Sequence, residues 1–152
     1  MPTVVVSGSM RKHYDGMVRA IQEFEKRGIT VLSPRVSSVI NPGHSFVLLG
    51  SDKTTNRATL EQSHLDAISR ADALYVHDPK VLQLRLRLWP LLRRQSYIGE
   101  STGYEIAWAR RESKPVFLSE ELPPDSIYKF HAMARVASIE TIAAFLRGEA
   151  KV

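Results

Sequence analysis

The fold is decided by residues 3–34, TVVVSGSMRKHYDGMVRAIQEFEKRGITVLSP. The β-branched apolar run at 3–7 is typical of a buried parallel strand. Residues 8–13 are expected to form a loop, and apolar side chains then recur at helical spacing over 14–26. A second apolar run at 29–33 predicts another strand. The order strand, helix, strand predicts a βαβ unit with a right-handed crossover.

The remainder of the chain continues this alternation after a long polar connection at 35–58, of a length that is usually functional or disordered. The expected elements are a helix at 60–69, a strand at 71–77, a helix at 102–111, a strand at 114–118, a short strand at 134–137 and a helix at 138–146. This pattern predicts one α/β domain over 1–152 with a mainly parallel sheet of four to five strands. Ligands of such sheets bind at the carboxyl ends of the strands, where we expect the loops after the first and third strands to meet residues 97–105.

Composition excludes several function classes. The 152 residues are 43% hydrophobic and 24% charged, which is ordinary for a globular domain. The chain has no cysteine, so disulfides, thiolate catalysis and cysteine-based zinc sites are excluded. No stretch of the sequence resembles a signal peptide or a membrane span, so a cytoplasmic protein without membrane association is expected.

A basic, Leu/Arg-rich insertion is expected at 80–96. It holds five basic residues and no acidic one, which equals the whole net charge of +5. Net positive charge favours anionic partners, but so local an excess disfavours nucleic acid as the partner. The alternating leucines at 82–88 have strand periodicity and could form an edge ribbon, an oligomer contact, a lid or a short amphipathic helix. We expect a partner subunit to cover them, because an exposed leucine ribbon would aggregate.

Two segments carry candidate binding residues. The first follows the first strand and comprises Ser7, Gly8, Ser9, Met10 and Arg11. The glycine permits close backbone approach, the serines can donate hydrogen bonds, and the arginine can pair with phosphate. The segment matches neither a Walker A loop nor a dinucleotide fingerprint, and a tight turn with solvated charges explains it equally well.

The second segment is residues 97–109, in which small and hydroxyl residues (Gly99, Ser101, Thr102) precede a helix. Free N–H groups at a helix start suit an anionic or polar ligand, and Glu105 could meet that ligand. The alternative is a plain capping segment with Ser101 or Thr102 as the N-cap.

Three motifs together are similar to the nucleoside 2-deoxyribosyltransferase superfamily, which includes the 2'-deoxynucleoside 5'-monophosphate N-glycosidases. They are SGSMR at 7–11, ADALYV at 71–76 and GYEIAWA at 103–109, and the resemblance extends over nearly the whole chain. It implies a flavodoxin-like three-layer sandwich, a homo-oligomer, and cleavage or transfer at the N-glycosidic bond of a small nucleoside or nucleotide. It also implies that Glu105 attacks the sugar C1' and that residues 7–11 lie near the sugar or its 5'-phosphate, with no cofactor.

The chain departs from this family at two candidate positions. His64 stands where an aspartate is common, and Gly99 stands where an aspartate or serine is common. A histidine there is either a structural side chain or a group that orients Glu105 or contacts the leaving base. Tyr104 could stack on a base or pack in the core. Asp78 could bind sugar hydroxyls or form an Asp-Pro turn.

Three functions therefore remain open from the sequence. The first is an enzyme that uses Glu105, and the second is a non-catalytic nucleotide-binding or sensing module that has the same pocket. The third, which the sequence supports least, is a nucleic-acid-associated protein that uses residues 80–96. The five histidines show no compact ligand spacing, so no metal site is expected; they are His13, His44, His64, His77 and His131.

Overall fold

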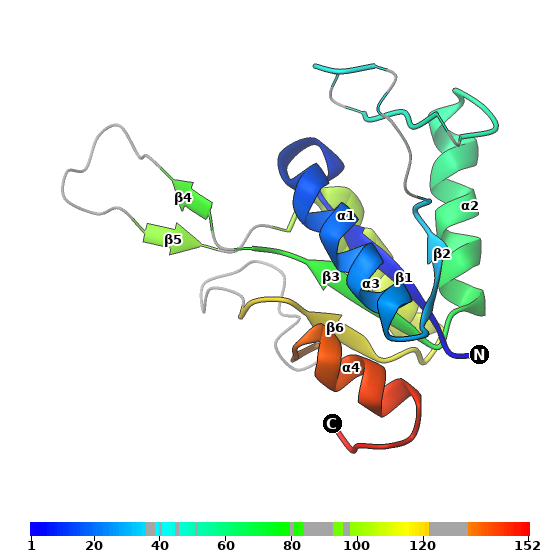
Figure 1. The fold of residues 1–152 in the computed structure, drawn as a ribbon. Helices are drawn as coiled ribbons and strands as arrows, with labels where there is room; N and C mark the ends of the chain where they lie inside the picture. The colour runs from blue at the N-terminus through cyan, green and yellow to red at the C-terminus, as the bar shows by residue number, and fades with distance from the viewer. Residues whose placement is uncertain are drawn as a thin grey trace.

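The computed structural model describes residues 1–35, 39, 41–44, 46–50, 52–79, 98–121 and 134–152, and the backbone of 81–83 and 93–95. A five-stranded, all-parallel sheet runs through the middle of the molecule in the order β2-β1-β3-β6-β7 (Figure 1). Its strands are β1 (Thr3–Gly8), β2 (Thr30–Ser33), β3 (Ala73–His77), β6 (Val116–Leu118) and β7 (Arg135–Val136). The α/β, flavodoxin-like architecture expected from the sequence is confirmed.

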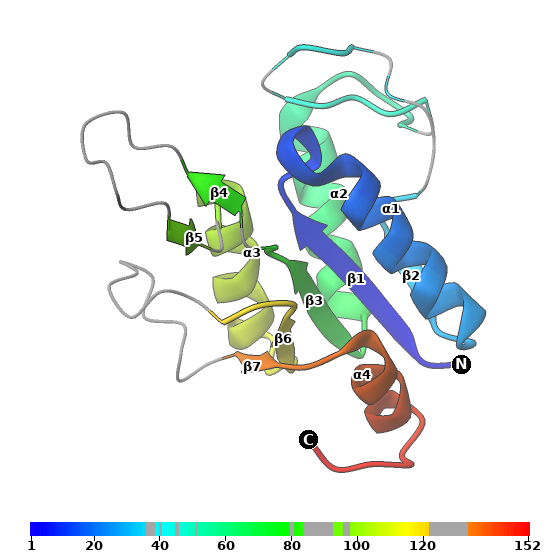
Figure 2. The ribbon, with the colours of Figure 1, turned by 60° about the vertical axis from the view of Figure 1, so that its left-hand side comes forward.

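Four helices cover the sheet, two on each face (Figures 1 and 2). They are α1 (Met10–Lys26), α2 (Arg57–Arg70), α3 (Glu100–Arg111) and α4 (Ile139–Leu146). Side chains alternate across a strand, so Val5 of β1 packs with α2 and α3 while Val4 and Val6 pack with α1 and α4. The apolar run at the start of the chain therefore fills both cores at once.

Helix α1 begins earlier than the sequence predicted. The prediction of a loop at 8–13 is wrong, because β1 extends to Gly8 and the helix begins at Met10. Ser9 is the N-cap, and its hydroxyl accepts a hydrogen bond from the backbone N–H of Lys12 at 3.3 Å. His13 has non-helical φ and ψ of −132° and 29°, so the first turn is kinked away from the rest of α1.

Helix α3 also begins earlier than predicted. Its N-cap is Gly99, which makes no side-chain capping hydrogen bond, so the prediction of Ser101 or Thr102 as N-cap is wrong. Both hydroxyl residues lie instead in the first turn, where the N–H of Gly103 already bonds the carbonyl of Gly99 at 2.9 Å.

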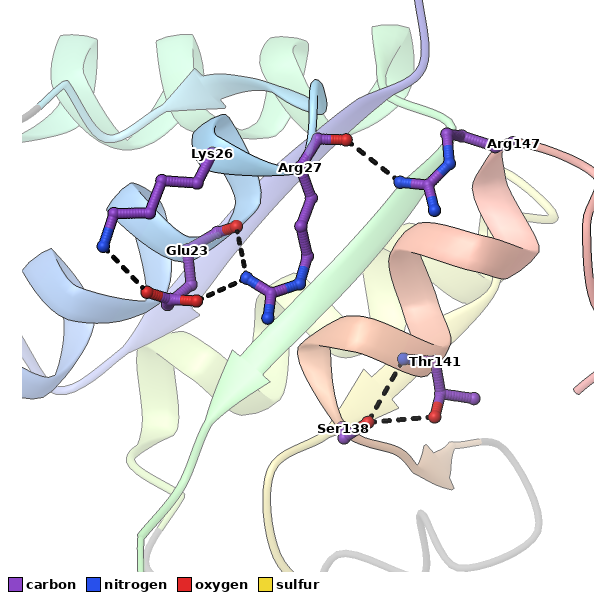
Figure 3. Close-up of polar contacts among 6 residues, drawn as sticks. All are labelled: Glu23, Lys26, Arg27, Ser138, Thr141 and Arg147. Atoms are coloured by element: carbon purple, nitrogen blue, oxygen red, sulfur yellow. Dashed lines mark hydrogen bonds and ion pairs between the residues drawn. The ribbon is translucent and has the colours of Figure 1, made fainter.

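The carboxyl-terminal part of α1 and the end of α4 are joined by polar contacts (Figure 3). Arg27 pairs with Glu23 within the last turns of α1, and the Arg147 guanidinium donates to the Arg27 carbonyl at 3.0 Å. Ser138 caps α4 by accepting a hydrogen bond from the Thr141 N–H at 3.1 Å. The contact between Arg147 and Arg27 joins the ends of two helices of the same face, at the edge where the strands begin.

The sequence between β3 and α3 contains a separate antiparallel pair, β4 (Val81–Gln83) with β5 (Arg93–Gln95). This pair extends beyond the carboxyl end of β3 and is not hydrogen-bonded to the main sheet (Figure 1). The predicted leucine alternation at 82–88 lies largely outside the described residues. Both chain termini lie towards the opposite edge, where the strands begin (Figures 1 and 2). Among the described segments, no helix is both long and apolar enough to cross a membrane.

Candidate active site

A cavity of about 460 Å³ opens at the carboxyl ends of β1 and β2. Its lining comes from the β1–α1 turn, the connection after β2, one side of α2 and the first turns of α3. The predicted residues that line it are Ser7, Gly8, Ser9, Met10, Arg11, His64, Gly99, Ser101, Thr102 and Glu105. Residues from segments that are far apart in the sequence therefore converge on one space.

The β1–α1 turn forms one wall of this cavity. Gly8 has a φ of +152°, and a Cβ there would lie 2.7 Å from the carbonyl oxygen of His77, so the turn requires glycine. The kinked first turn of α1 brings the side chains of Arg11 and Lys12 to the same wall. Backbone N–H groups of a helix start combined with two basic side chains favour an anionic group of a ligand.

His64 lies at the centre of a polar network that four elements build. Its Nδ1 is 2.6 Å from Ser33 Oγ at the end of β2, and its Nε2 is 3.1 Å from Ser7 Oγ in β1. The same Nε2 is 3.6 Å from Glu105 Oε2 in α3, with 18% and 19% of the two side chains exposed. At 3.6 Å the imidazole and the carboxylate are in contact but beyond hydrogen-bond range. A carboxylate and an imidazole thus face the cavity together.

The packing of α3 sets the position of Glu105. Thr102, Ile106 and Ala109 are buried on the side of the helix that faces the core. Since residues three and four apart share a helix face, Glu105 lies at the border of that buried stripe. The helix therefore presents the carboxylate to the cavity while its backbone is held by the core.

The connection after β2 supplies a wall that the sequence analysis did not include. Phe46, Val47 and Leu49 line the cavity from this segment, and Leu60 of α2 joins them. Asn41 organises the segment, because its side chain donates to the Phe46 carbonyl at 2.7 Å and accepts from the Leu48 N–H at 2.6 Å. These residues form an apolar end of the cavity.

Arg57 supports this apolar end from α2. Its guanidinium carbon lies 5.0 Å from the centroid of the Phe46 ring, and its Nε donates to Glu61 at 2.8 Å. The short apolar run FVLL at 46–49, inside an otherwise polar connection, is the sequence signal that could have indicated this wall.

Charge is unevenly distributed around the cavity. The basic lining residues, Arg11 and Lys12, belong to the β1–α1 turn, whereas the other segments contribute only acidic ones among the described residues. The acidic lining residues are Asp52, Glu61, Glu100 and Glu105. A ligand with one anionic end fits this polarity when that end lies at the β1–α1 turn.

The structure places Asp78 away from the cavity lining and fully buried. Its Oδ1 accepts hydrogen bonds from the Ser119 N–H and hydroxyl and from the Glu120 N–H at 2.9–3.2 Å. Burial raises the pKa of Asp78 to about 7, against the hydrogen bonds from Ser119 and Glu120, which lower it. The carboxylate thus ties β3 to the segment after β6, and it lies outside the lining of the cavity.

Tyr104 does not line the cavity either. The side chain is 60% exposed, and its ring centroid lies 6.5 Å from that of Trp108 one helical turn on. The side chain lies on the outer face of α3, so the expectation that it packs in the core is wrong.

A pair of histidines, His13 and His77, lies beside the β1–α1 turn. The rings of His13 and His77 are edge-to-face with centroids 6.2 Å apart. Burial, followed by the neighbouring His13 and Arg19, lowers the pKa of His77 to about 4. His77 Nδ1 and His13 Nε2 are buried without a hydrogen-bond partner in the described part of the structure. Within those same residues, no group of three or more acidic or histidine side chains could hold a metal ion.

No protein-family model and no curated protein sequence matches the chain. Solved structures do match. The CMP N-glycosidase BcmB of Clostridium botulinum superposes with a TM-score of 0.51 at 13% identity, covering 97% of this chain and 99% of that chain. A 2-deoxyribosyltransferase from Bacillus psychrosaccharolyticus superposes with a TM-score of 0.54 at 15% identity, covering 95% of each chain.

A conserved protein from Enterococcus faecalis V583 has a TM-score of 0.55 at 13% identity, covering 99% of each chain. At such low identity these matches establish a shared fold. They confirm, at the level of fold, the resemblance that the three sequence motifs indicated.

Proposed function

We propose that the protein cleaves the N-glycosidic bond of a nucleoside or nucleotide, or transfers the sugar to a second base. The observation that carries this proposal is the presence of Glu105, His64 and the β1–α1 turn around one cavity at the carboxyl edge of the sheet. The structural neighbours named as an N-glycosidase and a deoxyribosyltransferase support it, because enzymes with this fold perform that class of reaction.

In the proposed reaction, one oxygen of the Glu105 carboxylate forms a bond to C1' while the bond from C1' to the base nitrogen breaks. The base leaves with the electron pair of that bond and takes up a proton. Water or a second base then attacks C1' and gives up a proton, and the bond from C1' to the carboxylate breaks. Two displacements at the same carbon retain its configuration, and the choice of acceptor decides between hydrolase and transferase.

The lining of the cavity suggests how a substrate lies in it. A 5'-phosphate fits the β1–α1 turn, where Arg11 and the helix start supply positive charge. The base fits the apolar end, where Phe46 and Leu60 can cover its faces. The sugar then lies between them, within reach of Glu105.

The test is release of free base from a panel of ribo- and deoxyribonucleosides and their 5'-monophosphates, followed by chromatography. We expect Glu105→Gln to reduce release by roughly a thousandfold or more, since it keeps the shape of the side chain but removes the nucleophile. Glu112→Gln is the matched control, because Glu112 is an exposed residue at the other end of the same helix. Intact-protein mass should also show a glycosyl adduct on the wild type and not on Glu105→Gln.

Two other outcomes of the same experiment would contradict the proposed function. Release that persists at the wild-type rate in Glu105→Gln would refute attack by this carboxylate. A wild-type protein that binds one of these nucleotides yet releases no base would be a binding or sensing module with the same pocket.

A further inference from the structure

The His64 ring is held at both of its nitrogen atoms. Ser33 Oγ lies 2.6 Å from Nδ1, while Ser7 Oγ and Glu105 Oε2 lie 3.1 Å and 3.6 Å from Nε2. The four residues come from β2, α2, β1 and α3, and all of them line the cavity. No sequence pattern pointed to Ser33, and its contact with His64 is the shortest in the network.

The carboxylate of Glu105 favours a proton on the ring nitrogen that faces it. A proton on Nδ1 alone would leave the lone pair of Nε2 facing an anion at 3.6 Å, which is repulsive. A proton on Nε2 faces that anion favourably. In the neutral ring with Nε2–H, the Ser33 hydroxyl donates to Nδ1, and in the doubly protonated ring it accepts from Nδ1–H. Ser33 can satisfy Nδ1 in both states because a hydroxyl is donor and acceptor.

We propose that Ser33 is a positioning residue for the reaction proposed above: by bonding Nδ1 of His64 it keeps a proton on Nε2 that faces Oε2 of Glu105. Nε2 lies 3.1 Å from Ser7 Oγ and 3.6 Å from Oε2 of Glu105, so its proton attracts one carboxylate oxygen without a direct hydrogen bond, and the other oxygen is left for C1'. The catalytic meaning of this proposal rests on the proposed function, whereas the placement of the proton does not. A histidine that is only structural would require no proton directed at the cavity.

The proton can be located without any substrate. In protein labelled with ¹⁵N-histidine, the nitrogen shifts and couplings to the ring protons distinguish Nδ1–H from Nε2–H, and the His64 signals are those lost in His64→Gln. At neutral pH we expect a proton on Nε2 of His64 in the wild type. In Ser33→Ala, where Nδ1 loses this hydroxyl partner, we expect a measurable fraction of the rings to be protonated on Nδ1 alone. A wild-type ring protonated on Nδ1 alone, or a tautomer unchanged by Ser33→Ala, would overturn the proposal.

Kinetics test the positioning role. We expect Ser33→Ala to lower kcat by roughly ten- to a hundredfold with KM changed by less than about twofold, because the carboxylate is misdirected while binding is kept. Ser33→Thr retains the hydroxyl and should restore kcat to within about threefold. Thr30→Ala, which removes an exposed hydroxyl at the other end of β2, should leave both constants unchanged.

The two proposals fail separately. If no nucleoside or nucleotide is cleaved by the wild type, the proposed function fails, and the tautomer measurement still decides whether Ser33 directs the His64 proton. If base is released but Ser33→Ala keeps its kcat, or loses it as much as Ser33→Thr does, the proposed function stands and the role of Ser33 is wrong.

Discussion

Asp78 is a buried carboxylate whose pKa is raised by its surroundings. Its carboxylate is fully buried, and its Oδ2 lacks a hydrogen-bond partner among the described residues. Three donors reach Oδ1, yet burial outweighs them, so the pKa of Asp78 rises to about 7. The folded protein therefore binds a proton at Asp78 that the unfolded chain has already released.

This raised pKa predicts a specific pH dependence of stability. Between about pH 4 and pH 7 the folded state holds more protons at Asp78 than the unfolded state, so the free energy of unfolding falls as pH rises through this window. Asp78→Asn cannot ionise and should lose less stability between pH 5 and pH 8, by on the order of 3 kcal/mol relative to the wild type. Urea unfolding at both pH values measures the difference.

The pH dependence of stability must be compared between Asp78→Asn and the wild type, because the lowered pKa of His77 makes stability rise with pH, whereas the raised pKa of Asp78 makes it fall. Its pKa is lowered to about 4, so its stabilising contribution is present above about 6.5 and is lost as pH falls through 4. That term is common to both proteins and cancels. Identical pH profiles for Asp78→Asn and the wild type would show that Asp78 ionises normally in the folded protein.

Individual residues of the site could be predicted only where the sequence pattern around them indicated their position in the fold. Glu105 and the residues of the β1–α1 turn could be predicted to lie near one cavity because the strands are recognisable in sequence and the carboxyl ends of parallel strands meet at one edge. Ser33 could not, since a serine before a proline at a strand end is ordinary. Its contact with His64 exists only because β2 and α2 are brought together by the fold.

At the scale of elements, α1 and β3 approach each other closely at one point. A Cβ at Gly16 of α1 would lie 2.3 Å from Nε2 of His77, which is held beside the ring of His13. Glycine in a helix interior otherwise costs about 1 kcal/mol relative to alanine. The close approach of His77 explains why this helix has a glycine at position 16.

Gly16→Ala should therefore destabilise the protein, because overpacking of about 1–3 kcal/mol exceeds the gain in helix propensity. Thermal unfolding measures the change. In a His77→Ala background the obstacle is gone, and the same substitution should stabilise by about 0.5–1 kcal/mol. An increase in stability on introducing Gly16→Ala into the wild type would contradict the contact.

Hydrophobic periodicity predicted the type and order of the helices and strands, but it did not predict the residues at which the helices begin. The first helix was expected at 14, but Ser9 caps it and it begins at Met10. The third helix begins at Glu100 after an N-cap, Gly99, that offers no side-chain acceptor. Periodicity reports the buried face of a helix, and the first turn of α1 faces the cavity instead.

For the whole molecule, the α/β class and the mainly parallel sheet were predictable because strands and helices alternate along the chain. The approach of residues 46–49 to the cavity was not predictable. It depends on hydrogen bonds between Asn41 and the backbone of its own connection, which no periodic pattern reports.

The hairpin formed by β4 and β5 leads to a prediction about assembly. It is not bonded to the main sheet, and two strands alone are marginally stable in water. Its connecting sequence alternates leucine with polar residues, so we expect a second copy of the chain to cover it. Sedimentation should show a species larger than the 17.1 kDa monomer.

Replacing residues 84–92 by Asn-Gly should shift that species to the monomer, with the far-ultraviolet circular dichroism of the main sheet and helices retained. Replacement of the exposed Lys151 by alanine serves as a control that removes charge elsewhere. A wild type that sediments as a monomer, or an unchanged assembly after the replacement, would show that this segment is not the contact.

The position of the termini has a practical consequence. Both chain ends lie towards the edge of the sheet where the strands begin, and the cavity opens at the other edge. An affinity tag, a fusion partner or a covalent link to a bead can therefore be attached at either end without standing in front of the cavity. Because the chain also lacks cysteine, one introduced thiol would be the only attachment point for a maleimide dye that reports on ligand entry.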